Sequence, residues 1–252
     1  MTRIISIVNH KGGVGKTTSV SSLGVSLADL GRRVLLVDLD PQGNLSQTLS
    51  VPQTGRTLYE SLREGRDLPQ TQIRERLWVC PSSLDLVSMD LELSGVKGRE
   101  YRLRDLLSPL DYDYILLDCP PSLGLLTINA LTASGEVFVP LTPEALPAKG
   151  LGTLLDIIRR TREGLNPDLH LGGIIITRYQ RRKINRIVEE SLRETFGDLV
   201  FQTRIRENVD IAESPLQGKD IFSYSPRSIG ATDYRDLALE IDKKKVITGN
   251  KL

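Results

Sequence analysis

Residues 4–18 read IISIVNHKGGVGKTT, and this stretch decides the fold. A β-forming run, Ile4–Val8, is followed by a glycine-rich turn and then by residues with helical spacing. Such a turn at the N-terminus of a helix presents backbone N–H groups to an anion, and the helix dipole adds to the attraction. Lys16 would then reach the β- and γ-phosphates of a nucleotide, and the Thr17 hydroxyl would bind Mg²⁺. The stretch therefore predicts a phosphate-binding loop at the start of an α/β fold.

The loop departs at one position from the common phosphate-loop pattern G-x-x-x-x-G-K-[ST]. That pattern needs glycine at position 10, where this chain has His10, and a second lysine, Lys11, comes next. The order of strand, glycines, Lys-Thr pair and helix still favours a phosphate loop over a chance glycine turn. We expect His10 to pack or to form a hydrogen bond beside the loop rather than to take part in catalysis.

Short apolar runs rich in β-branched residues recur along the chain. They are continuous rather than alternating, which is typical of parallel strands buried on both faces. Helical stretches separate them, and strand–helix–strand alternation implies right-handed crossovers. We therefore predict a single α/β domain over residues 1–252, with a doubly wound, mostly parallel sheet and helices on both faces. The strands expected are Ile4–Val8, Val34–Val37, Ile115–Leu117, Val137–Val139 and Ile174–Ile176.

The helices follow from apolar residues at three- and four-residue spacing. One apolar stripe is Val20, Leu23, Leu27 and Leu30, on a helix that Gly31 would end. Another is Leu151, Leu154, Leu155 and Ile158. The stretch 43–110 is less regular, with helices expected at Leu58–Leu62 and Tyr101–Leu107 and an edge strand at Leu77–Val79. The folded core is expected over about 2–242, with a short basic tail at 243–252.

The composition excludes several classes of protein. Lys+Arg total 33 against 32 Asp+Glu, so the net charge of +1 excludes a globally basic nucleic-acid binder but not a local basic patch. Two cysteines, Cys80 and Cys119, are too few for a disulfide framework, and Cys119 is expected to be an inert buried residue. No apolar run reaches the 18 or so residues of a membrane span, and the N-terminus runs into a strand without a signal-peptide pattern. We expect a cytoplasmic globular protein.

With these segments in view, the chain resembles the deviant-Walker-A ATPases of the MinD/ParA superfamily, and within them the ParA/Soj partition ATPases. Lys11 matches the second lysine of that family's phosphate loop. VDLDPQGN at 37–44 is similar to its switch I, and ILLDCPPS at 115–122 to its Walker B and switch II segments. Residues 208–241 resemble its C-terminal pattern of Glu-x-Pro, Gly-Lys and a closing helix. The resemblance implies a P-loop NTPase fold, ATP and Mg²⁺ as cofactors, and slow, partner-stimulated hydrolysis of ATP to ADP and phosphate.

The resemblance also implies roles for particular residues. The nucleotide-binding residues would be Lys11, Gly12, Gly13, Val14, Gly15, Lys16, Thr17 and Thr18, with Arg206 and Asn208 near the adenine. Mg²⁺ would be held by Thr17 and by Asp118, directly or through water, and Asp40 is a further candidate. The catalytic residues would be Lys11, Lys16 and Asp40, with Asp40 orienting the attacking water. The switch residues would be Asp38, Pro120 and Pro121.

Several of these roles have an alternative. Lys11 would cross a dimer interface to the nucleotide of a second subunit, or else contact phosphate within its own chain. Asp38 is either a switch residue or a hydrogen-bond acceptor that fixes a loop. The prolines at 120–121 either stiffen a γ-phosphate sensor or form a plain turn. The family's adenine segment Ile-Pro-Arg-Asn-Val reads Ile205-Arg206-Glu207-Asn208-Val209 here, so a basic residue that could serve DNA binding is replaced by Glu207.

The partition interpretation implies a homodimer in the ATP state, non-specific binding to double-stranded DNA at the nucleoid, and release by a ParB/Spo0J-like protein, without a membrane role. The candidate DNA-binding residues are Arg181, Arg182, Lys183 and Arg186, with Arg178 nearby. We expect Arg182 and Arg186 to lie one helical turn apart. A solvated helix face, with Arg186 paired to Glu189 or Glu190, is the alternative for this cluster. The alternative functions are a MinD-like regulator on a membrane, an ATPase that positions another cargo, and a metabolic ATP-using enzyme.

Overall fold

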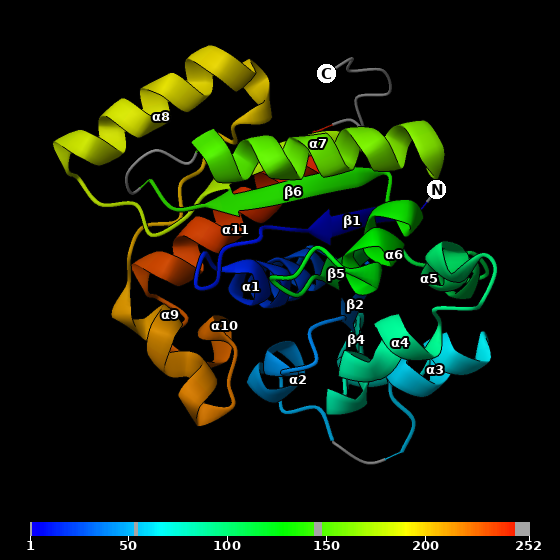
Figure 1. Ribbon diagram of the computed structural model, residues 1–252. Helices are drawn as coiled ribbons and strands as arrows, with labels where there is room; N and C mark the ends of the chain where they lie inside the picture. The colour runs from blue at the N-terminus through cyan, green and yellow to red at the C-terminus, as the bar shows by residue number, and fades with distance from the viewer. Residues whose placement is uncertain (1, 53–54, 144–147, 245–252) are drawn as a thin grey trace.

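A seven-stranded sheet runs through the computed structural model, which describes residues 2–52, 55–143 and 148–244 (Figure 1). The strand order is β3-β4-β2-β5-β1-β6-β7, and every neighbouring pair is parallel except β3 with β4. The predicted doubly wound, mostly parallel α/β sheet is confirmed. The strands are β1 (Arg3–Ile7), β2 (Val34–Asp38), β3 (Thr71–Arg74), β4 (Leu77–Cys80), β5 (Tyr114–Asp118), β6 (Glu136–Leu141) and β7 (His170–Ile176).

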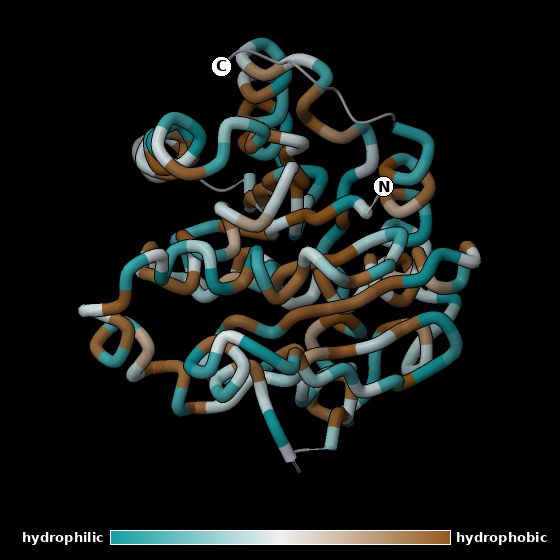
Figure 2. The backbone as a smooth tube through the Cα atoms, turned by 90° about the vertical axis from the view of Figure 1, so that its right-hand side faces the viewer, coloured by the Kyte–Doolittle hydropathy of each residue, from teal (hydrophilic) through white to brown (hydrophobic). Residues whose placement is uncertain are grey.

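Helices cover both faces of this sheet, as its continuous apolar strands require. Successive residues of β2 point to opposite faces, so Val34 and Leu36 pack against α1 and α11, whereas Leu35 and Val37 belong to the core under α3, α5, α6 and α7. Figure 2 shows the hydrophobic strands between these two layers. The α-helices are α1 (Lys16–Asp29), α2 (Asn44–Thr48), α3 (Leu58–Glu64), α4 (Met89–Glu92), α5 (Arg102–Leu107), α6 (Leu125–Ala133), α7 (Ala148–Gly164), α8 (Lys183–Phe196), α9 (Val209–Glu213), α10 (Ile221–Tyr224) and α11 (Ile229–Lys243).

The local predictions agree with the structure except at the edge of the sheet. Gly31 follows α1 with a φ of 86°, as expected of the residue that ends a helix. The prediction of an edge strand at Leu77–Val79 is wrong, because β4 pairs with β2 on one side and β3 on the other. The edge strand is β3, whose sequence TQIR is only partly buried and carries no apolar run. Of the predicted tail 243–252, residues 245–252 lie outside the described residues.

The carboxyl ends of three neighbouring strands bring the predicted motifs together. Strand β5 lies between β1 and β2, and in the register Asp118 is opposite both Ile7 and Asp38. The phosphate loop follows β1, and β2 ends at Asp38, with Asp40 two residues beyond it. Ligands of open α/β sheets bind at this edge. The topology therefore places the loop and the carboxylates in one site.

Candidate nucleotide site

The phosphate loop ends in a helix N-terminus without a side-chain cap. Gly13 and Gly15 have φ values of 71° and 86°, a left-handed conformation that glycine adopts without a Cβ clash. Gly15 is the N-cap of α1, and no side chain accepts from the first N–H groups of the helix. These N–H groups and the helix dipole form an anion-binding site.

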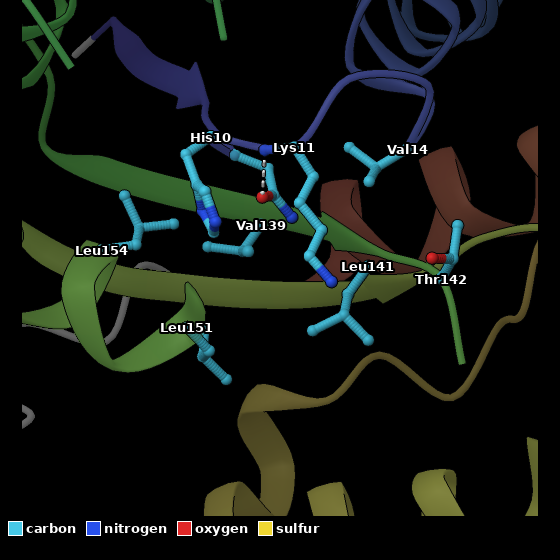
Figure 3. A pocket seen from close by; sticks show the side chains of 9 residues that line it. His10, Lys11, Val14, Val139, Leu141, Thr142, Leu151 and Leu154 are labelled. Atoms are coloured by element: carbon cyan, nitrogen blue, oxygen red, sulfur yellow. Dashed lines mark hydrogen bonds between the residues drawn. The ribbon is translucent and has the colours of Figure 1, made fainter. Parts of the chain in front are cut away.

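Neighbouring strands hold the loop in this shape. Asn9 donates from Nδ2 to the carbonyl of Pro140 (2.8 Å), and its Oδ1 accepts from the N–H of Lys11 (3.0 Å; Figure 3). The Thr177 hydroxyl at the end of β7 donates to the carbonyl of Val14 (2.9 Å). Because β6 and β7 both fix the backbone, the loop is formed before any ligand binds.

Lys16 lies inside the loop, and its Nζ donates to the carbonyl of Lys11 at 3.2 Å. Burial lowers the pKa of Lys16, and the carboxylates of Asp118 and Asp40 oppose that change. An ammonium group held between a ring of N–H donors and two carboxylates is placed to move onto a phosphate.

Asp118 is a buried carboxylate without a hydrogen-bond partner. Both of its oxygens are inaccessible, and neither makes a hydrogen bond of normal geometry in the described structure. Burial raises the pKa of Asp118 well above its ordinary value and the neighbouring Asp38 raises it further, while the nearby Thr17 hydroxyl and Lys16 ammonium oppose the rise. A buried charge is stable only when it is paired or binds a metal ion. The residues present therefore fit a cation at this position.

The donor set fits Mg²⁺ that is shared with a nucleotide. In the described part of the chain, no group of three or more His, Cys, Asp or Glu residues could hold a metal by itself. Mg²⁺ in nucleotide sites commonly takes one or two protein oxygens and completes its shell with phosphates and water. Asp118 and the Thr17 hydroxyl are oxygens of the right kind.

Asp38 fixes the loop between itself and Ser46. Its Oδ2 accepts from the N–H (2.9 Å) and the hydroxyl (2.7 Å) of Ser46, and its Oδ1 accepts from the N–H of Asp40 (3.3 Å). Burial raises the pKa of Asp38 to about 6, although the Ser46 hydrogen bonds oppose this. Of the two interpretations of Asp38, these contacts support the loop-fixing one.

A cleft of about 550 Å³ opens in front of the phosphate loop. Its lining contains six of the ten predicted nucleotide-binding residues, Asp40, one of the three predicted switch residues, and part of the C-terminal segment, to which no role was predicted. The predicted residues in it are Gly12, Gly13, Gly15, Lys16, Thr17, Thr18, Asp40 and Pro121. The unassigned residues are Ile211, Ser214, Pro215, Leu216 and Ile221. Only the Glu-x-Pro pattern of the C-terminal segment pointed to them, and it did not say where they lie.

Asp118, Asp38 and Pro120 do not line this cleft but are buried close to it. Val14 also faces away from it, because its side chain is buried in a second, small pocket. Figure 3 shows that pocket, where His10 and Lys11 lie near Val139, Leu141 and the α7 residues Leu151 and Leu154. His10 therefore packs beside the loop, with Nδ1 buried and without a partner.

The two predicted adenine residues lie in different surroundings. Arg206 borders a neighbouring cleft, where Asp233 accepts from its backbone N–H (2.9 Å) and from its Nε (3.0 Å). Its side chain is thus not brought to the nucleotide cleft. Asn208 is the N-cap of α9, and its Oδ1 is buried without a partner. Asn208, like Arg206, does not line the nucleotide cleft.

The basic cluster is exposed at the start of α8. The helix begins at Lys183, and Arg182 is its extended N-cap. The N–H of Arg186 donates to the carbonyl of Arg182 at 3.2 Å, so Arg182 and Arg186 lie one helical turn apart, as predicted. Arg186 pairs with Glu190 at 3.7 Å, whereas Glu189 is buried elsewhere. In the described part of the chain, Arg181, Arg182 and Lys183 form no ion pair.

Comparison with known proteins agrees with this geometry. The family model of the AAA domain matches residues 2–171. The chain is 44% identical over 252 residues to the chromosome partitioning protein ParA of Myxococcus xanthus, covering 96% of this chain and 88% of that protein. It is 43% identical over 249 residues to the sporulation initiation inhibitor protein Soj of Bacillus subtilis, covering 96% and 98%. The chain belongs to the ParA/Soj family of partition ATPases.

A solved structure of similar fold carries the expected ligands. Cobyrinic acid a,c-diamide synthase from Mycobacterium smegmatis, with a bound ATP analogue and magnesium, is 36% identical and superposes with a TM-score of 0.81, covering 94% of this chain and 93% of that one. The P-loop ATPase fold of this ParA/Soj-family chain is thereby confirmed. No helix in the described ranges is long and apolar enough to cross a membrane.

Proposed function

We propose that this partition ATPase binds ATP and Mg²⁺ in the cleft beside the phosphate loop, and that ATP joins two copies of the chain over that loop. The observation that carries the proposal is the buried, unpartnered Asp118 carboxylate, which lies near the ammonium of Lys16. A cation at Asp118 and an anion at Lys16 together describe a magnesium nucleotide.

In the proposed mechanism the loop N–H groups and Lys16 bind the phosphates, and Thr17 and Asp118 hold Mg²⁺, Asp118 directly or through water. Bound Mg²⁺ supplies charge neutralisation at the β- and γ-phosphates. Asp40, whose Oδ1 accepts from the N–H of Gln42 at 3.0 Å, orients a water in line with the γ-phosphorus. The water oxygen bonds to that phosphorus as the bond to the β-phosphate oxygen breaks, a proton of the water passes to solvent, and ADP and phosphate result.

The outer side of the loop supports a face-to-face dimer. Lys11 is exposed, and no atom outside the immediate chain neighbours lies within 4 Å of where a Cβ on Gly12 or Gly13 would be. The monomer therefore leaves this backbone bare. A second copy could approach it closely and place its own Lys11 on the nucleotide, as an arginine finger does in trans.

The dimer would present two copies of the basic cluster to double-stranded DNA, and a ParB/Spo0J-like protein would stimulate hydrolysis and release it. This cycle would place the protein in the cytoplasm at the nucleoid. The MinD-like alternative would need an amphipathic lipid-binding segment, and residues 245–252 of the predicted basic tail lie outside the described residues.

The Lys11→Ala variant tests the proposal. It should bind a fluorescent ATP analogue through Lys16 and Thr17 as tightly as the wild type, yet remain a monomer by light scattering with Mg²⁺ and a non-hydrolysable ATP analogue. Lys16→Ala is the control that should lose nucleotide binding itself. If Lys11→Ala dimerises like the wild type, Lys11 acts only within its own chain and the proposed interface is wrong.

A further inference from the structure

Ser82 is a buried serine that follows β4 and lies outside the predicted motifs. It is 1% exposed, its hydroxyl donates to the carbonyl of Asp40 at 2.6 Å, and its N–H donates to the hydroxyl of Ser46 at 3.3 Å. These contacts join positions that are 42 and 36 residues apart in the sequence. A residue next to a strand inside the sheet thus holds the backbone of the proposed water-orienting residue.

The pairing of β2 with β4 brings Ser82 to this place. The two strands are parallel, and in the register Val37 is opposite Cys80. The chain beyond Cys80 therefore runs beside the chain beyond Val37, at the edge of the sheet where ligands of open α/β folds bind. Serine in this position can donate its hydroxyl to a backbone carbonyl of the neighbouring segment.

Both backbone polar groups of Asp40 are held by hydrogen bonds. Its N–H donates to Asp38 Oδ1 at 3.3 Å, and its carbonyl accepts from the Ser82 hydroxyl and, at 2.9 Å, from the N–H of Gly43. Ser46 links the two buried side chains, because its hydroxyl donates to Asp38 and accepts from Ser82. Gly43 belongs to the same turn as Asp40 and would move with it, whereas the Ser82 hydroxyl ties the Asp40 carbonyl to the end of β4.

Ser82 acts on the cleft through Asp40 and not by itself. Asp40 lines the nucleotide cleft, and its Oδ1 accepts from the N–H of Gln42 at 3.0 Å. Ser82 does not line the cleft. Because a misplacement of about 1 Å in a catalytic group can cost roughly 100-fold in rate, a hydroxyl that fixes the backbone of such a group can affect the chemical step without touching the nucleotide.

We propose that Ser82 is a positioning residue for ATP hydrolysis, whose hydroxyl fixes the main chain of Asp40 so that the carboxylate can orient the attacking water. The inference rests on the proposed function, because it needs Asp40 to orient that water. It assigns no part in ATP binding to Ser82, since the phosphate loop is held by β6 and β7 on the other side of the site.

The Ser82→Ala variant tests this inference. In single-turnover phosphate release, with Mg²⁺ and with the full chain in excess over ATP, its hydrolysis rate should fall roughly 10-fold. Its dissociation constant for a fluorescent ATP analogue should stay within about twofold of the wild type, and its dimerisation by light scattering should be unchanged. Ser134→Ala is the matched control, because Ser134 is also 1% exposed and donates to the carbonyl of Ala130 at 2.7 Å, but precedes the amino end of β6. This control should keep the wild-type rate.

The outcomes separate the two proposals, with Asp40→Ala measured alongside. If Asp40→Ala hydrolyses ATP at the wild-type rate, the proposed function of Asp40 fails. If Asp40→Ala is slow and Ser82→Ala keeps the wild-type rate, the inference alone is overturned. A loss of ATP affinity equal to the loss of rate in Ser82→Ala, or an equal loss of rate in Ser134→Ala, would also contradict the inference.

A second variant covers the case in which Ser82→Ala does not fold. Ser82→Cys fills the same place with a thiol, which is only a weak hydrogen-bond donor. A slower rate at unchanged ATP affinity supports the inference, and the wild-type rate contradicts it.

Discussion

At the scale of single residues, Asp118 shows what a pattern predicts and what it leaves open. Its place at the end of an apolar strand, 102 positions after Lys16, predicts a carboxylate at the sheet edge. Among the described residues, no group makes a hydrogen bond of normal geometry to this carboxylate. That arrangement depends on the packing of three strands, which no local pattern contains. The same holds for Asp38, whose loop-fixing function depends on Ser46 folding back onto it.

Asp118→Asn should stabilise the nucleotide-free protein. Because burial raises the pKa of Asp118, the native state keeps a proton that the unfolded chain loses, so stability falls as pH rises above about 4. Because the amide does not ionise, the variant does not lose stability in this way. We expect its free energy of unfolding to exceed that of the wild type by about 1–2 kcal/mol at pH 7.5 and to equal it near pH 4. Urea unfolding across this pH range measures it. A variant less stable than the wild type at pH 7.5 would show that the carboxylate is paired within the chain.

At the scale of elements, the apolar periodicity of the sequence predicted where strands occur but not which strands and side chains lie next to one another. The run Leu77–Cys80 reads the same whether its strand lies inside the sheet or at its edge, and β3 beyond it is too polar to be recognised. Helix α8 gives a second case. Sequence spacing offered Glu189 as a partner for Arg186, whereas the fold buries Glu189 against Arg193 (2.9 Å) and Arg204 (2.6 Å).

Glu189→Ala should therefore destabilise the protein much more than Glu190→Ala. The Glu189 side chain is 5% exposed and joins α8 to the 200–206 segment, whereas Glu190 is 62% exposed with one partner at 3.7 Å. By urea unfolding, we expect Glu189→Ala to lower the free energy of unfolding by about 2 kcal/mol and Glu190→Ala by less than about 0.5 kcal/mol. The first loss is no larger because Arg204, one of the two partners of Glu189, is itself partly exposed. Equal losses would mean that the Glu189 pairs are as weak as a surface pair.

At the scale of the whole molecule, the alternation of strands and helices was enough to predict the sheet and to place the motifs at one edge. The position of the C-terminal segment Ile211–Ile221 was not predictable, because it reaches the cleft only through its packing beside α1 and α2. Net charge acts at this scale too. A chain with a charge of +1 cannot hold DNA through its overall field, so the proposed DNA binding requires a local patch.

Dimerisation would double that patch, because each chain presents Arg181, Arg182, Lys183 and Arg186. Since about 0.9 counterions are released per phosphate contact, six to eight contacts give a log–log salt slope of roughly −5 to −7. The double variant Arg182→Glu with Arg186→Glu should lose binding to duplex DNA whatever its sequence, as measured by fluorescence anisotropy. Its ATP-dependent dimerisation, measured by light scattering, should persist. The control variant Arg66→Glu with Arg76→Glu, on the β3–β4 side, carries the same change of charge and should keep the wild-type salt slope of DNA binding.

If the Arg182→Glu, Arg186→Glu variant binds DNA with an unchanged salt slope, Arg182 and Arg186 form a solvated surface. The DNA contact would then have to lie near Arg204, Arg206 or Lys243.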